Sequence, residues 1–198
     1  MDLEPSSGSS ALALARRLDR PVVLVGMMGV GKTSLGRKLA GALAWPFVDA
    51  DEEIERAAQL SIPEIFAQYG EAAFRDGERR VIARLLSEST QKVIATGGGA
   101  FCNEDTRALI LERAVTVWLD ADLDTLLERT ARKDNRPLLR EGNPREILAR
   151  LRAERAPAYS QAPVQVLSGS TPHARTLAAV VEGIEGWLAS MGSRGNAA

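Results

Sequence analysis

A glycine-rich motif near the start of the chain limits the possible folds more than any other feature. Residues 26–33 read Gly-Met-Met-Gly-Val-Gly-Lys-Thr, which fits the pattern G-x-x-x-x-G-K-[ST]. An apolar run, Val22–Val25, precedes the motif, and a helical pattern from Lys32 to Ala44 follows it. Glycines let backbone N–H groups curl around phosphates, and the N-terminus of the following helix adds positive charge. This context indicates a loop that binds the phosphates of a nucleoside triphosphate.

The residue types within the motif have separate roles. We expect Lys32 to reach the β- and γ-phosphates and the hydroxyl of Thr33 to ligate Mg²⁺. A GTPase switch would need a guanine-reading N-K-x-D sequence, and no lysine of this chain lies in one. An ATPase motor is normally larger. A chain of 198 residues with this loop near its start therefore favours a small-molecule kinase.

Short apolar runs alternate with longer helical patterns along the chain. Strands are predicted at 22–25, 45–48, 93–95, 115–119 and 164–167, with a last helix from about Pro172 to Ser190. The helical stretch from Asp51 to Glu88 is interrupted near 61–63 and 69–70. Strands that alternate with helices predict an α/β, P-loop NTPase-type fold with three layers, a five-stranded parallel sheet flanked by helices. We expect one domain over 21–190, a flexible tail at 1–20, in which 11–18 suits a short helix, and a frayed end at 191–198.

Composition excludes several classes of function. The formal net charge is −1, which offers no basic surface for nucleic acid or for an anionic membrane. The single cysteine cannot form an intramolecular disulfide. No apolar run approaches the ~20 residues that a membrane span needs, and the start lacks the basic region of a secretory signal. We predict a soluble cytoplasmic protein that binds neither nucleic acid nor membrane.

Two aspartates follow the second predicted strand. Asp49 and Asp51 are two residues apart, so their side chains share one face of an extended chain. An acceptor hydroxyl needs a group that orients it and takes its proton, and water bound to Mg²⁺ needs carboxylate partners. The acidic run also suits a helix N-terminus. We assign capping to Glu52 and Glu53 and the chemistry to Asp49 and Asp51.

Four further clusters carry residue types suited to a second substrate. They are Gly70–Arg75, Thr96–Gly99, the polar stretch 129–143 around Asn135–Leu139, and Arg155–Tyr159. Three glycines after a buried strand allow backbone N–H groups close to a ligand, or form a flexible loop. The stretch 129–143 has the composition of a mobile lid, and the helix before the last cluster is predicted to end near Arg155.

Together these segments resemble the shikimate kinase family, over about residues 22–188. The family patterns appear in order as G-x-M-G-x-G-K-[ST] at 26–33, F-x-D-x-D-x-x-I-E at 47–55, G-E-x-x-F-R at 70–75, T-G-G-G at 96–99, R-P-L-L at 136–139 and R-x-P-x-Y at 155–159. One such motif is weak evidence, whereas six in order are strong. The resemblance implies a fold like that of nucleoside monophosphate kinases, with a mobile lid. The first twenty residues have no counterpart in the family pattern.

The resemblance also implies an activity and a site. The activity is transfer of the γ-phosphoryl of ATP to the 3-hydroxyl of shikimate, in the chorismate route to aromatic amino acids, by a monomer that uses Mg²⁺. The implied catalytic residues are Lys32, Asp51 and Arg136. The implied ATP contacts are Gly29, Val30, Gly31, Lys32, Thr33, Ser34, Arg129, Arg136 and Pro172. The implied shikimate contacts are Asp51 at the diol, Arg75 and Arg155 at the carboxylate, and the backbone of Gly97, Gly98 and Gly99. Thr33, and Asp49 through water, would hold Mg²⁺.

Other functions remain open from the sequence. Gluconate-type and nucleoside monophosphate kinases share the fold and the loop but lack the acceptor-side set. A nucleotide-binding regulator without activity would not need intact Lys32 and Asp51. Asp120 follows an apolar strand and is an alternative metal-site aspartate. His173 and Cys102, the only residues of their types, have no partner cluster and suit packing or surface roles.

Overall fold

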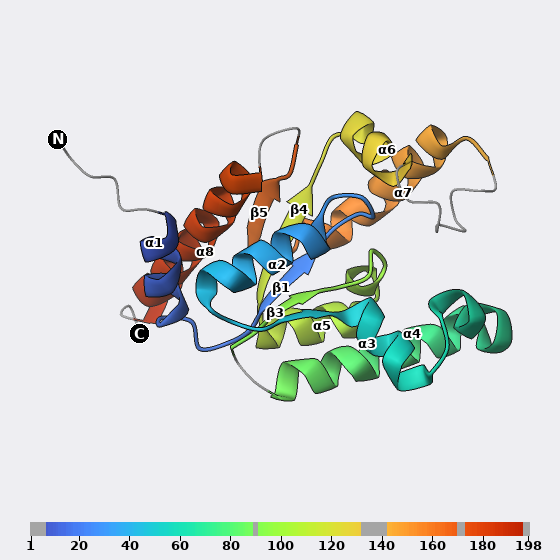
Figure 1. Cartoon of the computed structure of the whole chain (residues 1–198), viewed down its shortest axis with the longest axis horizontal. Coiled ribbons are helices and arrows are strands. Elements are labelled where there is room, and N and C mark those ends of the chain that lie inside the picture. The colour runs from blue at the N-terminus through green and yellow to red at the C-terminus, as the bar shows by residue number, and fades with distance from the viewer. Residues whose placement is uncertain (1–6, 89–90, 132–141, 170–172, 196–198) are drawn as a thin grey trace.

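The computed structural model of the protein describes residues 7–88, 91–131, 142–169 and 173–195. Within them, five parallel strands form one sheet in the order β2-β3-β1-β4-β5 (Figure 1). The strands are β1 (Val22–Val25), β2 (Phe47–Asp49), β3 (Val93–Ala95), β4 (Val115–Asp120) and β5 (Val164–Leu167). The predicted parallel sheet is confirmed. The second strand begins two residues later than predicted, and the fourth ends one residue later.

The central strand β1 sets the register of the sheet. Val22 pairs with Val93 of β3 on one side and with Val115 of β4 on the other. Every residue of β1 is buried, because helices cover both faces of the sheet. Parallel strands align their carboxyl ends at one edge, so the loops after β1, β2 and β3 come together there.

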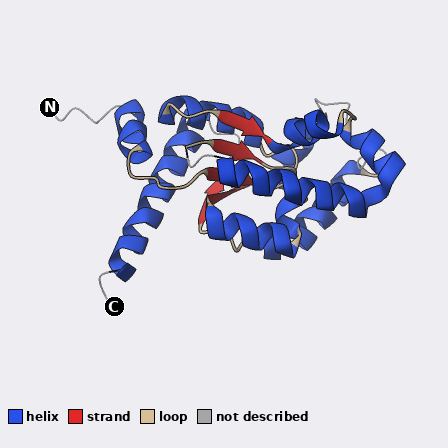
Figure 2. Ribbon diagram, turned by 90° about the horizontal axis from the view of Figure 1, so that it is seen from below, coloured by secondary structure: helices blue, strands red, loops and turns tan. Residues whose placement is uncertain are grey.

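Helices on both faces produce the predicted three layers (Figure 2). Helices α2 (Lys32–Leu43) and α8 (His173–Gly195) pack together on one face, and α4 (Ile62–Glu88) and α5 (Glu104–Arg113) pack together on the other. In α2, the i+4 spacing of Leu35, Leu39 and Leu43 buries all three side chains. The core therefore lies between the sheet and these four helices.

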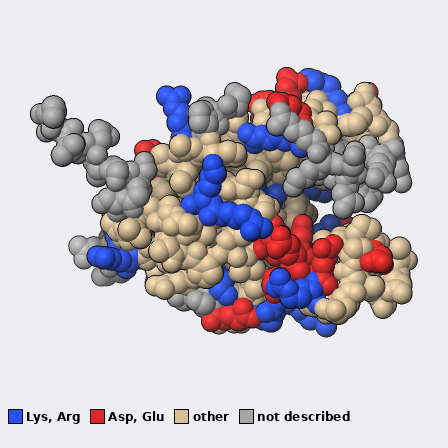
Figure 3. Space-filling model, in the orientation of Figure 1, with Lys and Arg blue, Asp and Glu red and all other residues tan. Residues whose placement is uncertain are grey.

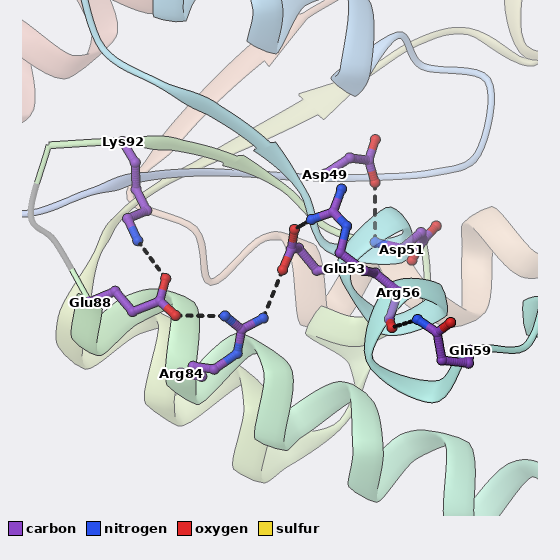
Figure 4. A network of polar contacts seen from close by, with 8 residues as sticks. All are labelled: Asp49, Asp51, Glu53, Arg56, Gln59, Arg84, Glu88 and Lys92. Carbon is purple, nitrogen blue, oxygen red and sulfur yellow. Dashed lines mark hydrogen bonds and ion pairs between the residues drawn. The ribbon is translucent and has the colours of Figure 1, made fainter.

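The predicted interruptions between residues 51 and 88 are confirmed. Helix α3 (Ala50–Ala58) ends before Ser61, and α4 begins at Ile62. Within α4, Gly70 has φ 78° and ψ 174°, a conformation that breaks the helical path and that glycine adopts without strain. An ion pair of 2.8 Å between Arg84 and Glu53 joins α4 to α3 (Figure 4).

Helices α6 (Leu123–Ala131) and α7 (Pro144–Tyr159) lie next to each other at the end of the molecule beyond β4 (Figure 1). The prediction that the helix ends near Arg155 is wrong, because α7 continues one more turn, to Tyr159. Pro157 removes one backbone donor, yet the amide of Ser160 still bonds to the carbonyl of Ala156. Most of the predicted lid, residues 132–141, lies outside the described residues.

The expected tail at 1–20 is wrong from residue 7 onward. Residues Ser7–Ala15 form helix α1, which packs against α2 and α8. Ala11, Leu14 and Leu18 recur at a spacing of three or four residues, and their side chains are buried. The sequence over 11–18 suits a short helix, but the polar run before it favoured a tail. At the other end α8 continues to Gly195, so residues 191–195 are helical rather than frayed.

On the face shown in Figure 3, Lys and Arg side chains are interspersed with Asp and Glu side chains. This mixture agrees with the formal net charge of −1. Among the described residues, no helix is both long enough and apolar enough to cross a membrane.

Candidate active site

The glycine-rich loop connects β1 to α2 at the carboxyl edge of the sheet. Gly29 and Gly31 have φ values of 81° and 98°, in the left-handed region that glycine tolerates. The ammonium group of Lys32 donates to the carbonyls of Gly26 at 2.8 Å and Met27 at 3.0 Å. The ammonium group therefore packs against the phosphate loop, where it can contact an anion that the loop binds.

Asp49 uses its two carboxylate oxygens for different tasks. Oδ1 accepts from the amide of Asp51 at 3.1 Å and so caps helix α3 (Figure 4). Oδ2 accepts from the hydroxyl of Thr33 at 2.9 Å. Capping and a place in the site are thus not alternatives for Asp49. One oxygen orders the helix, and the other connects the end of β2 to the phosphate loop.

The charged side chains predicted to bind the acceptor converge on the three glycines after β3. A Cβ atom placed on Gly97 would lie 2.7 Å from Oδ1 of Asp51, and one placed on Gly99 would lie 2.7 Å from Nη2 of Arg75. A Cβ atom on Gly98 would lie 3.4 Å from Nη1 of Arg155. Side chains at 97 and 99 would therefore displace the charged groups. Here the requirement for glycine is space, since neither residue has a positive φ.

Asp51 lies in a strongly charged environment. Burial, with a contribution from the nearby carboxylate of Asp49, raises its pKa to about 6, and Lys32 opposes this rise. A carboxylate with a pKa near 6 is mostly ionised at pH 7.5 and is a stronger base than an ordinary aspartate. Asp51 is thus suited to orient a hydroxyl and accept its proton.

Glu78 is a site residue that sequence reasoning missed. Its side chain is 1% exposed, and Oε2 accepts from Nη1 of Arg75 at 2.7 Å. Oε1 is buried without a hydrogen-bond partner, and it would lie 3.1 Å from a Cβ on Gly97. Burial raises the pKa of Glu78, and the charges of Arg75 and Arg155 oppose that rise. The signal in the sequence was its position three residues after Arg75, one helical turn along.

The extra turn of α7 places Arg155 and Tyr159 on one helical face. Both side chains donate to the carbonyl of Gly98, Arg155 at 3.1 Å. Burial raises the pKa of the Tyr159 hydroxyl, which keeps it a donor. The ring of Tyr159 also stacks on Phe101 of the 3₁₀ helix η1 (Ala100–Cys102). These contacts hold α7 against the segment that contains Gly98 and Phe101.

Arg129, expected beside adenine, lies in the last turn of α6. Its Nη1 donates to the carbonyl of Val30 at 3.0 Å, and its Nη2 donates to the carbonyl of Gly169 at 2.8 Å. It therefore connects α6, the phosphate loop and the segment after β5. The predicted contacts Arg136 and Pro172 lie outside the described residues.

The structure also places Asp120, Cys102 and His173, which are not among the site residues that the resemblance implies. Asp120 accepts two hydrogen bonds from the guanidinium of Arg152, at 2.6 and 3.2 Å. This pairing gives Asp120 a structural contact with α7. Cys102 is partly buried, and burial raises the pKa of its thiol, so it is not a ready nucleophile. His173 is the exposed first residue of α8.

The oxygens near the loop fit Mg²⁺ in chemical type. The hydroxyl of Thr33 and the carboxylate of Asp49 are hard oxygen donors within hydrogen-bond distance of each other. Among the described residues, no group of three or more His, Cys, Asp or Glu side chains could hold a metal by itself. A cation here would need phosphate oxygens and water as further ligands, which is usual for Mg²⁺ bound with a nucleotide.

The phosphate loop opens α2 at the edge of a five-stranded parallel sheet, and a second site lined by arginines and carboxylates lies beside it. These two features define the protein as a P-loop kinase with a small-molecule acceptor. A shikimate kinase family model matches residues 28–185, and the chain belongs to this family. It is 63% identical over 185 residues to the shikimate kinase of Novosphingobium aromaticivorans, covering 92% of this chain and 96% of the relative. It is 58% identical over 162 residues to that of Caulobacter vibrioides, covering 82% and 80%. The solved structure of the Acinetobacter baumannii enzyme in complex with shikimate matches with a TM-score of 0.76 at 39% identity, covering 82% of this chain and 90% of that one.

Proposed function

We propose that this protein transfers the γ-phosphoryl group of ATP to the 3-hydroxyl of shikimate. The observation that carries the proposal is the convergence of Asp51, Arg75 and Arg155 on the glycines 97–99. Aspartate can orient a hydroxyl, and two arginines can bind a carboxylate, so together they match a hydroxylated acid. The membership of the chain in the shikimate kinase family supports the choice of that acid.

The donor side binds ATP through the phosphate loop. The backbone of Gly29, Val30 and Gly31 and the start of α2 at Thr33 and Ser34 face the phosphates with N–H donors. Lys32 exchanges its contacts with the loop carbonyls for contacts with the β- and γ-phosphates. Arg129 and Pro172 flank adenine in this proposal, and Arg136 meets the transferring phosphoryl group.

Mg²⁺ belongs to the proposal as the partner of ATP. Thr33 would ligate it directly, and Asp49 would hold it through water. When bound, the ion neutralises charge on the β- and γ-phosphates. The hydroxyl of Thr33 donates to the carboxylate of Asp49, so the two side chains lie close enough to hold one ion between them.

The acceptor side binds shikimate and activates its hydroxyl. Arg75 and Arg155 bind the carboxylate, and the glycines let the ring approach the backbone. Asp51 accepts the proton of the 3-hydroxyl as that oxygen bonds to the γ-phosphorus. The bond from the γ-phosphorus to the bridging oxygen breaks, and ADP leaves with that oxygen. We propose that the protein acts as a monomer, as the resemblance to the shikimate kinase family implies, with small molecules as its partners.

A coupled assay of ADP release tests the proposal. The purified protein, with ATP and Mg²⁺, is offered shikimate, gluconate and nucleoside monophosphates in separate reactions. We expect ADP release well above background with shikimate alone, and phosphorus NMR should locate the product phosphate at the 3-oxygen. Turnover with gluconate or a monophosphate, or none with any acceptor, would contradict the proposal.

A further inference from the structure

The orientation of the peptide group between Val30 and Gly31 affects how the phosphate loop presents its N–H groups. Val30 is fully buried, and it lies between two glycines with left-handed backbone conformations. Glycine has access to many backbone conformations, so the loop sequence alone leaves the orientation of this peptide weakly determined. Contacts from outside the loop must determine it.

Ser168, the residue directly after β5, makes such a contact. Its hydroxyl donates to the carbonyl of Val30 at 2.9 Å, although 138 residues separate the two. The amide of Ser168 donates to the carbonyl of Asp120, the last residue of β4, at 2.6 Å. Ser168 is 4% exposed, so its position is set by the sheet and not by solvent.

Arg129, on α6, is a second side chain that donates to the Val30 carbonyl. Its Nη1 donates to the carbonyl of Val30 and, at 3.3 Å each, to the carbonyl and hydroxyl oxygens of Ser168. The amide, hydroxyl and carbonyl of Ser168 are therefore all engaged. The Val30 carbonyl thus accepts from a rigid pair of donors that belong to the β5 end and to α6.

The orientation of the Val30 carbonyl determines the direction of a phosphate-binding donor. In a trans peptide the C=O and the following N–H point in opposite directions. Because the carbonyl of Val30 points toward Ser168 and Arg129, the N–H of Gly31 points away from them. The Gly31 N–H is one of the N–H groups at the N-terminus of α2. These groups have no acceptor within the helix, so they can bind an anion.

We infer that Ser168 is a positioning residue for the phosphate loop. It orients the Val30–Gly31 peptide through the Val30 carbonyl and does not itself touch the nucleotide. The inference rests on the proposed binding of ATP phosphates by residues 26–33. It concerns the phosphates and not adenine, and this separates the role of Ser168 from any contact that Arg129 makes with the base.

The test compares Ser168→Ala and Ser168→Thr with the parent protein, using ATP, inorganic tripolyphosphate and shikimate as separate ligands in calorimetric titrations with Mg²⁺. Loss of one neutral hydrogen bond corresponds to roughly two- to tenfold in the equilibrium that orders the loop, and this is the largest loss of affinity that disorder of the loop would cause. We expect Ser168→Ala to weaken the binding of ATP and of tripolyphosphate by a factor in that range. The affinity for shikimate, measured without nucleotide, should stay within about twofold of the parent value. Ser168→Thr keeps the hydroxyl and should restore most of the affinity. The matched control is Ser190→Ala, which removes a serine hydroxyl that donates to the Trp187 carbonyl on α8.

The outcomes separate the inference from the proposed function. Parent-like tripolyphosphate affinity in Ser168→Ala, or an equal loss of shikimate affinity, would overturn the positioning role. A parent protein that binds neither ATP nor tripolyphosphate would overturn the phosphate site itself, and the role of Ser168 with it. If Ser168→Ala does not fold, Ser168→Cys has nearly the parent volume but a weak donor, and it has the same expected result.

Discussion

Replacing Asp51 with Asn should abolish phosphoryl transfer and, at the same time, stabilise the ligand-free protein at neutral pH. The pKa of Asp51 rises from its ordinary value of 3.8 to about 6, mainly because the carboxyl is buried and next because Asp49 lies close by. Ionising this group in the folded protein therefore costs about 3 kcal/mol more than in the unfolded chain. Asparagine has nearly the same shape and no charge, so it removes this cost.

The sign of the effect follows from proton binding. Between about pH 4 and about pH 6 the folded protein retains a proton on Asp51 that the unfolded chain has released, so stability falls as the pH rises. Above this window the full cost of about 3 kcal/mol is present, and below it the cost is absent. From about pH 5 to about pH 7.5 the parent should lose about 1.4 kcal/mol that the Asn variant does not lose.

Urea unfolding at several pH values, followed by circular dichroism, measures this difference. The quantity of interest is the free energy of unfolding of Asp51→Asn minus that of the parent, because pH-independent effects of the substitution cancel in its slope. Glu52→Gln is the matched control, since Glu52 lies on the same helix with its side chain 57% exposed. A difference that stays constant from pH 5 to 7.5, or one that shrinks as the pH rises, would refute the reasoning about Asp51.

Three further predictions concern activity. Lys32→Ala should keep a native circular dichroism spectrum and lose most turnover, because the phosphates lose their main cation; near-normal kcat would remove the nucleotide site from this loop. Arg75→Ala and Arg155→Ala should each weaken shikimate binding about tenfold to a hundredfold, a loss of roughly 1.5–3 kcal/mol, with ATP binding little changed in titrations. Lysine at either position should restore shikimate binding only in part, because it lacks the planar guanidinium group. A selective loss of ATP affinity would place that arginine on the donor side. Gly97→Ala should raise KM for shikimate, because its Cβ would lie 2.7 Å from Oδ1 of Asp51, and an unchanged KM would show that Asp51 moves freely.

Local patterns in the sequence determined most of the framework. The bounds predicted for the strands at 22–25, 93–95 and 164–167 match those of β1, β3 and β5. Strands β1 and β3 are short apolar runs because they are buried on both faces of the sheet, whereas in β5 buried Val164 and Val166 alternate with exposed residues. The phosphate loop was equally clear, since its glycines and the following helix act over a few residues. The break at Gly70 also followed from local sequence.

The tertiary structure alone decided contacts between distant segments. The sequence could not show that Arg155 reaches the Gly98 carbonyl 57 residues away, because that contact depends on the packing of α7 against η1, which follows the glycines. It could not show that Glu78 is buried, since its i+3 spacing from Arg75 equally suits an exposed ion pair. Nor could it bring Ser168 to Val30, because the two meet only when β5 pairs with β4 beside the phosphate loop. A hydrogen bond across the sheet forms where the packed strands place its two groups, and this placement has no pattern within either segment.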